Sequence, residues 1–363
     1  MHPPDRSLMR WWPHALATVL VVLVVSYVGY WYFLTSQLRD GWATLRTEQG
    51  RNLVQLDAKS VAAVGFPTRI ALDVNTPILR KGGTPTYLYR ADGLTVALNP
   101  FAPTQASLTT TGGAQHLTFR DDQAGTALDL SSGRVAGNLV LTDLGGALDH
   151  ARVAADDVSG TLDLTPGKPG DAFAARAVEI TVHPGAFARD GEPQQDAAIV
   201  VTGRDVTLPE RISDILGNAI AYTTLDAQLT GGKGGPFRLD ALAREGPRAL
   251  RAFFEGDGRL DVTNFALQWG ALDLTARGSL KLDALHRPEG TLTVDVAGYR
   301  EVLGALVRKG TLAQGEADTI GGALDLLAAL RRGPKGRVPV LLIFQKGKLL
   351  VGPVQAATLK PLF

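Results

Sequence analysis

Residues 14–34 read HALATVLVVLVVSYVGYWYFL and carry no formal charge when the histidine is neutral. As an α-helix this stretch is about 30 Å long, which matches the hydrocarbon core of a bilayer. It ends with Tyr30, Trp31, Tyr32 and Phe33, and aromatic residues are typical of the membrane–water interface. We therefore predict that residues 14–34 form a transmembrane anchor and that these four side chains lie at the interface.

A cleaved signal peptide and a buried core helix are the two alternatives for this stretch. A signal peptide has an apolar core of about 7–15 residues, followed by small residues at the cleavage site. The apolar run is longer than that and ends in aromatic residues, without an Ala-x-Ala-like exit. A helix that is apolar on all sides would need a large domain to enclose it. The sequence thus favours an uncleaved signal anchor.

The charges on either side of the anchor predict its orientation. The N-terminal arm, residues 1–13, contains Arg6 and Arg10 against Asp5. Because positively charged flanks remain in the cytoplasm, this arm is predicted to lie inside the cell. Residues 35–363 are then predicted to lie outside the cytoplasmic membrane, in the periplasm.

Composition limits the classes of function. The 363 residues include no cysteine, which excludes disulfides, thiolate catalysis and cysteine-based metal sites. The formal net charge of +1 gives no general attraction to nucleic acid, so no nucleic-acid partner is expected. The 41 glycines and 20 prolines favour many short strands separated by turns.

The chain beyond the anchor has the alternation of a mainly β protein. Ile70, Leu72 and Val74 alternate with Ala71 and Asp73, which predicts a strand with one buried face. Similar runs recur about every ten residues between turn signals, as in antiparallel sheets. These runs are 53–58, 94–98, 117–120, 127–130, 136–141, 160–164, 178–182, 198–202, 258–262, 267–269, 272–276, 279–283 and 290–296, with a closing hairpin of 338–345 and 348–351.

Helical spacing interrupts the strands in a few places. It predicts a juxtamembrane helix within residues 35–50 and helices over 209–221, 247–255, 299–307 and 316–330. The strands before and after residue 206 define an N-terminal β-rich part, 51–205, and a C-terminal β-rich part with helices, 206–363.

The predicted fold class is therefore mainly β, with minor α+β character. We expect a long curved antiparallel sheet with a few helices, preceded by one transmembrane helix. An antiparallel sheet can keep one face in water, and the helices are too few to cover it. A closed sandwich or barrel fits the same periodicity.

The sequence lacks recognised catalytic motifs. The six histidines show no metal-ligand spacing, and no nucleophile elbow, Walker A loop or Rossmann fingerprint is present. Lysine in the Gly-rich residues 230–236 is interpreted as a flexible loop, and the aspartate pairs at 121–122 and 156–157 as solvated turns. No catalytic residue, cofactor site or metal site is predicted, and the protein is expected not to be an enzyme.

One short motif stands out between two strands. Gly65, Phe66 and Pro67, followed by Arg69, form a turn or bulge for which we predict a structural role. If Phe66 is a core residue, its truncation is expected to destabilise the domain. If truncation does not change stability, Phe66 belongs to a binding surface.

Several motifs occur in the order of a known family. They are the N-terminal anchor with an aromatic end, Gly65-Phe66-Pro67-x-Arg69, Asn99–Pro103, Leu272–Asp283 with Arg287–Gly290, and Val338–Pro353. The chain resembles the bacterial domain of unknown function 2125 over its whole length. That family usually has a second aromatic residue after Gly-Phe-Pro, where this chain has Thr68. The resemblance implies a single-anchor protein of the bacterial envelope and assigns no reaction.

A looser resemblance concerns style and architecture. The Gly-rich Leu-Asp-Leu repeats are similar to those of periplasmic AsmA-like proteins, which are implicated in moving or organising envelope lipids. Together with the one-sided strands, this favours a bacterial inner-membrane protein that binds lipids or acyl chains in an apolar groove of a curved sheet. The alternative is a structural or assembly protein that binds other envelope proteins through strand edges.

Overall fold

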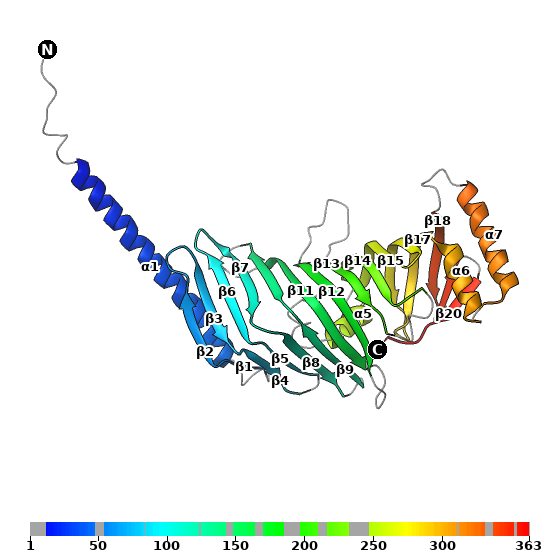
Figure 1. The fold of residues 1–363 in the computed structure, drawn as a ribbon, viewed down its shortest axis with the longest axis horizontal. Coiled ribbons are helices and arrows are strands. Elements are labelled where there is room, and N and C mark those ends of the chain that lie inside the picture. Colours follow the sequence, from blue (N-terminus) through cyan, green and yellow to red (C-terminus); the bar gives the residue numbers. More distant parts are fainter. Residues whose placement is uncertain are drawn as a thin grey trace, which may run out of the picture.

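The computed structural model describes most of the chain after its N-terminal arm. The described residues are 12–47, 54–83, 85–122, 125–142, 148–163, 170–184, 197–209, 216–231, 247–310, 312–330, 337–351 and 354–362. Figure 1 shows a long bent sheet with helix α1 at one end and helices α6 and α7 at the other. The prediction of a mainly β, antiparallel fold after an apolar N-terminal helix is confirmed.

The described part of the chain forms 20 strands in one sheet, and all its strand pairs are antiparallel. The first half contains β1 (Val54–Asp57), β2 (Ser60–Val64), β3 (Ile70–Asn75), β4 (Ile78–Lys81), β5 (Thr86–Arg90), β6 (Gly93–Asn99), β7 (Ala102–Thr111), β8 (Gln115–Asp121), β9 (Thr126–Ser132) and β10 (Val135–Leu141). The second half contains β11 (Leu148–Asp163), β12 (Asp171–Pro184), β13 (Ala197–Thr207), β14 (Ala219–Thr230), β15 (Arg259–Trp269), β16 (Leu272–Leu282), β17 (Pro288–Ala297), β18 (Val338–Gln345), β19 (Lys348–Val351) and β20 (Val354–Thr358).

The sheet is a meander in which neighbours in sequence are neighbours in space. Strands β11 to β20 pair in chain order. Before them, consecutive strands lie end to end in the pairs β1/β2, β3/β4, β5/β6, β7/β8 and β9/β10. Each strand of one pair bonds to one strand of the next pair, so this half of the sheet has two branches. One branch contains β2, β3, β6, β7 and β10, and the second contains β1, β4, β5, β8 and β9. Strand β11 joins the two branches, since its first part pairs with β10 and its last part with β9.

A line of backbone irregularities separates the two branches. We call this line the crease, and it runs through Thr76, Gly112, Asp157 and Asp205, all of which have positive φ angles. Hydrogen bonds hold adjacent strands together along it, for example from Gly133 N to Asp156 O at 2.9 Å. Because a residue with positive φ departs from extended geometry, the strands bend at the crease.

The sheet is open in the part of the chain that the structure describes. At one end, β1 pairs only with β4 and β2 only with β3, and at the other end β20 pairs only with β19. The structure therefore shows an open bent sheet, and neither the closed barrel nor the closed sandwich that the periodicity had left as alternatives.

The described helices are α1 (Trp12–Thr47), α5 (Pro247–Glu255), α6 (Tyr299–Arg308) and α7 (Gln314–Leu330). The last three confirm the helices predicted there. The predicted helix over 209–221 is wrong at its end, because Ala219 already begins β14; residues 210–215 lie outside the described residues. Because Ala219 and Ile220 pair with β13 in the sheet, they adopt strand geometry in spite of the local helical spacing.

Candidate functional site

Helix α1 unites the predicted anchor and the predicted juxtamembrane helix in one uninterrupted element. Its residues Val19–Asp40 are long and apolar enough to cross a membrane, by length and composition alone. A membrane anchor and a signal sequence both meet this description. The exposed side chains along the first part of the helix are apolar, and the later part contacts the first strands (Figure 1).

One face of the sheet is apolar across nearly all of its strands. Two adjacent rows of directly paired residues define it. The first row contains Ile70, Leu98, Ala106, Leu139, Ala151, Val182, Ile199, Ala227, Val262, Gly278, Leu292 and Leu342. The second contains Ala63, Leu72, Val96, Leu108, Gly137, Val153, Ile180, Val201, Leu225, Phe265, Ala276, Val294 and Val340. We call this surface the apolar face.

The opposite face is polar, because successive side chains of a strand point to opposite sides. One of its rows contains Asp73, Thr95, Thr109, Ala136, Ala154, Glu179, Thr202, Thr224, Ala266, Thr275 and Asp295. Arg152 pairs with Glu179 at 2.6 Å on this face, and the Thr95 hydroxyl donates to Asp73 at 2.7 Å. The sheet is therefore amphipathic as a whole.

The crease keeps apolar residues on one side although their spacing changes. In strand β13, a Cβ atom placed on Gly203 would lie 3.1 Å from Cγ2 of Val206, three residues further along. Residues three apart in a regular strand face opposite sides, so the irregularity at Asp205 shifts the alternation by one residue. Val206 is directly paired with Ala175, which is paired in turn with Val158.

The second branch of the sheet extends the apolar face beyond the crease. Its row of paired residues contains Leu56, Leu79, Tyr89, Leu117, Leu130, Gly160 and Phe173, two residues along the strands from Val158 and Ala175. The hydroxyl of Tyr89 contacts Oε1 of Gln115 at 3.3 Å, and burial raises the pKa of Tyr89. The sheet thus offers apolar side chains on both sides of its bend.

Helices cover parts of the apolar face. At the first strands, Trp31 and Leu34 of α1 pack on Ile70, with Leu38 and Leu98 beside them. Near the middle, Phe253 of α5 packs with Ala197 and Leu229, in a cluster that also contains Ile199, Leu250, Phe254 and Leu260. At the far end, α6 contacts β16 and α7 contacts β18, where Val338 and Val294 are buried.

The strip between α1 and α5 is left uncovered by the described residues. Leu139 is 38% exposed, Val153 46% and Ile180 41%, although all three belong to the apolar face. They lie on the neighbouring strands β10, β11 and β12. Contiguous exposed aliphatic side chains of this kind are typical of surfaces that bind an apolar partner.

The marked Gly-Phe-Pro motif lies against the aromatic end of α1. Gly65 has φ +100°, and its carbonyl accepts a hydrogen bond from Arg69 N at 2.8 Å, which closes a tight turn between β2 and β3. The indole Nε1 of Trp31 donates to the Arg69 carbonyl at 3.0 Å, and its ring meets Phe66 edge-on at 5.3 Å. The Tyr27 hydroxyl donates to the carbonyl of Pro67.

A second turn reaches the same helix. The Tyr30 hydroxyl donates to the Pro100 carbonyl at 3.0 Å, and the Tyr27 ring stacks on Phe101 with centroids 6.2 Å apart. The sequence marked Asn99–Pro103 only as a family motif and did not connect it with the anchor. We call α1 residues Tyr27–Trp31 together with these two turns the anchor junction.

The four predicted interface residues occupy different surroundings. Trp31 is buried at the anchor junction, whereas Tyr32 and Phe33 are exposed. Tyr30 is less exposed, at 39%. Phe66 is 54% exposed, so it is packed on one side only and is not a core residue. Figure 1 places this junction at the end of the sheet from which α1 projects.

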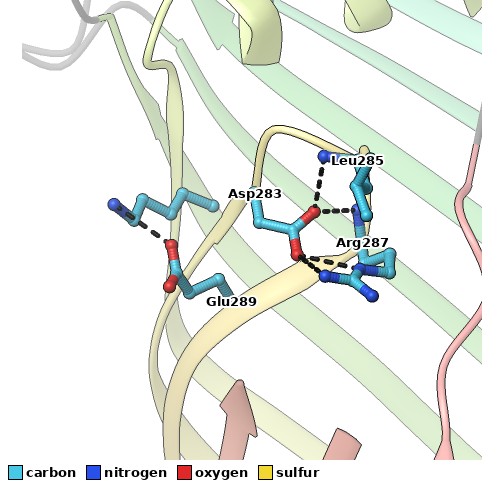
Figure 2. Close-up of polar contacts among 5 residues, drawn as sticks. Asp283, Leu285, Arg287 and Glu289 are labelled. Atoms are coloured by element: carbon cyan, nitrogen blue, oxygen red, sulfur yellow. Dashed lines mark hydrogen bonds and ion pairs between the residues drawn. The ribbon is translucent and has the colours of Figure 1, made fainter. Parts of the chain in front are cut away.

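A polar turn connects the end of β16 to the start of β17. Asp283 accepts hydrogen bonds from the backbone N–H groups of Leu285 and Arg287, both at 2.9 Å, and an ion pair from the Arg287 guanidinium at 2.7 Å (Figure 2). The Arg287 side chain holds the pKa of Asp283 below its usual range. His286 of the same turn contacts Glu255 of α5 at 3.0 Å, so the turn ties α5 to the sheet.

A family model described as "Uncharacterized protein conserved in bacteria (DUF2125)" matches residues 31–360. The chain belongs to the DUF2125 family. The match begins at Trp31, so the matched part of this DUF2125 protein includes Trp31, the two turns of the anchor junction and the apolar face. No curated protein and no solved structure matches the chain. The likeness to AsmA-like proteins stays a prediction.

Among the described residues of this DUF2125 protein, no group of three or more histidine, aspartate or glutamate side chains is placed to hold a metal ion. The aspartates predicted to be solvated at 156–157 lie on the crease, where Asp156 bonds through its backbone. The features that distinguish the molecule are the apolar face and the anchor junction.

Proposed function

We propose that this DUF2125 protein is a non-enzymatic, single-pass protein of the bacterial inner membrane that binds the acyl chains of envelope lipids on its apolar face. The uncovered strip of Leu139, Val153 and Ile180 is the observation that supports lipid binding most directly. An acyl chain lying on this strip would remove these side chains from water. Each methylene group of the lipid that is buried contributes about 0.8 kcal/mol.

The dimensions of the apolar face suit an extended ligand. The first apolar row crosses twelve strands from β3 to β18, and neighbouring strands are about 4.8 Å apart, so the row is about 50 Å long. The row has no charged member, and the Arg152–Glu179 ion pair lies on the other face. An unbranched apolar chain fits such a surface better than a compact polar metabolite, which would need convergent hydrogen-bonding groups.

The packing of α1 supports a retained anchor over a cleaved signal peptide. Trp31 and Leu34 bury Ile70 completely, so cleavage within or after the aromatic end would uncover the start of the apolar face. The charge bias around α1 supports an N-terminus in the cytoplasm and a main domain in the periplasm. In this arrangement the apolar face begins beside the membrane and leads away from it.

Photocross-linking on the two faces of one strand tests lipid binding. A photoreactive phenylalanine analogue replaces Leu139 on the apolar face or, as the matched control, its exposed neighbour Asn138 on the polar face. After irradiation in cells, we expect phospholipid or lipid A attached at position 139 and none at position 138, by mass spectrometry of the purified full chain. Equal lipid labelling at both positions, or none at either, would contradict the proposal.

An assembly function is the second candidate, and the open sheet edges favour it. Strand β20 and the strand formed by β1 and β2 each pair on one side only within the described residues. An exposed edge can add a strand from another protein. In the same cross-linking experiment, attachment of an envelope protein at edge residue Val61, with no lipid at position 139, would favour this candidate.

A further inference from the structure

The two turns of the anchor junction expose large aromatic side chains next to the proposed membrane anchor. Phe101 is 81% exposed at the turn between β6 and β7, and Phe66 is 54% exposed at the turn between β2 and β3. Residues 93–115, which include the second turn, contain no Lys, Arg, Asp or Glu, and in the first turn the only charged residue is Arg69 at its end. A largely exposed phenylalanine on a loop with so little charge is unfavourable in water and suits an apolar partner.

The contacts of the two turns with helix α1 indicate how deep the turns lie relative to the membrane. An α-helix rises about 1.5 Å per residue, so Tyr27 lies about 10 Å before the end of the apolar stretch at Leu34. Phe101 stacks on Tyr27, and the Pro67 carbonyl accepts from the same tyrosine. Both turns therefore reach back along the helix to a level within its apolar stretch, where the lipid headgroups and upper acyl chains lie.

We propose that Phe66 and Phe101 insert into the membrane interface from which α1 emerges. The β-domain then contacts the bilayer at three places, which are α1 and the two turns. This inference rests on the proposed function only in requiring that α1 crosses the membrane. The partner is the lipid surface itself, because the turns are continuous with α1 and with exposed Tyr32 and Phe33. Aromatic side chains at this level match the interfacial belt of membrane proteins.

The three-point contact fixes where lipid enters the apolar face. Ile70 directly follows the Gly-Phe-Pro turn and begins the first apolar row, and Leu98 directly precedes the second turn. Inserted turns place this end of the apolar face at the depth of the acyl chains. A lipid leaving the bilayer between the two turns would then pass onto the sheet without crossing water.

Site-directed fluorescence tests the insertion, and the absence of native cysteine makes single labelling clean. The full-length chain carries an environment-sensitive probe on Phe66→Cys or Phe101→Cys and is reconstituted in phosphatidylethanolamine–phosphatidylglycerol nanodiscs. Val22→Cys on the exposed apolar part of α1 is the control inside the membrane, and Leu285→Cys, exposed at the far turn, is the control in water. The measurement is quenching by lipids with a nitroxide near the headgroup end of the acyl chain.

We expect positions 66 and 101 to be quenched several-fold more than position 285, with a blue-shifted emission. Quenching at position 22 together with water-like emission at both 66 and 101 would overturn the insertion while leaving the anchor intact. No quenching at position 22 would overturn the anchor and the insertion together. If Phe66→Cys fails to fold, position 101 decides, because Phe101 is 81% exposed and its substitution removes little buried surface. Lipid cross-linking at position 139 is a separate result.

Discussion

The indole N–H of Trp31 and the backbone carbonyl of Arg69, thirty-eight residues apart, form a 3.0 Å hydrogen bond that joins the apolar helix to the first strands. The same indole covers Ile70, so one side chain both bonds to the Arg69 carbonyl and closes the end of the apolar face. Because buried tryptophan needs a partner for its N–H, the bond fixes how the helix is rotated against the sheet. Helix α1 and the β-domain are thus one packed unit.

Removing the Trp31 side chain should destabilise the β-domain. Trp31→Ala leaves a cavity over Ile70 and an unsatisfied carbonyl, which together cost about 3–5 kcal/mol in the free energy of unfolding. Trp31→Phe retains most of the burial and should cost about 1 kcal/mol for the lost hydrogen bond. Chemical denaturation of the full chain in detergent measures both, and exposed Phe33→Ala is the control within about 0.5 kcal/mol of wild type. Equal stability of Trp31→Ala and Phe33→Ala would contradict the packed junction.

Gly65 should tolerate no side chain. Its φ of +100° disfavours any other residue, and a Cβ atom would lie 2.7 Å from the Arg69 carbonyl oxygen. Gly65→Ala is expected to lower the free energy of unfolding by about 1–2 kcal/mol or more. Gly82→Ala is the matched control, because a Cβ there meets no atom within 4 Å. A Gly65→Ala melting curve that overlies that of Gly82→Ala would show that the turn relaxes without cost.

The turn in Figure 2 should make part of the stability depend on pH. The guanidinium of Arg287 lowers the pKa of Asp283 in the folded state, so this carboxylate stabilises the fold above its ordinary pKa of about 3.9. That stabilisation is lost as the pH falls through the lowered folded-state pKa. Asp283→Asn should therefore be less stable than wild type at neutral pH, and the two curves should converge in acid.

Denaturation of wild type and Asp283→Asn at several pH values checks this convergence. Glu289→Gln on the adjoining strand β17 is the control at neutral pH, because the Lys281–Glu289 pair is solvent-exposed at 3.3 Å and should contribute less than about 1 kcal/mol. A constant difference between wild type and Asp283→Asn at all pH values would show that the Asp283–Arg287 pair is not the cause.

A polar residue on the uncovered strip should remove lipid without unfolding the protein. Ile180 is 41% exposed, so Ile180→Gln loses little packing and is expected to change the free energy of unfolding by less than about 1 kcal/mol. Co-purifying lipid, measured by mass spectrometry, should fall strongly because an amide on the strip must be desolvated. Thr181→Gln, on the polar face of the same strand, should leave lipid unchanged. Equal lipid content in the two variants would move the binding surface elsewhere.

The local features of this protein were predictable from short-range patterns of residues. The uncharged run of residues 14–34 predicted the helix, alternation predicted the strands, and helical spacing predicted α5, α6 and α7 within one or two residues. These features depend on side chains close together in the chain. The Gly-Phe-Pro motif was likewise recognised as a turn, since glycine and proline restrict the backbone locally.

How these features combine depends on contacts between distant parts of the chain. Leu130 and Leu139 stand at opposite phases of the alternation, yet both belong to the apolar face, because the crease shifts the phase between them. A sequence pattern does not record that shift, since it depends on backbone angles set by neighbouring strands. The contacts of Trp31 with Phe66 and of Tyr27 with Phe101 join residues tens of positions apart. Such contacts follow from the pairing of whole strands, which positions the turns beside the helix.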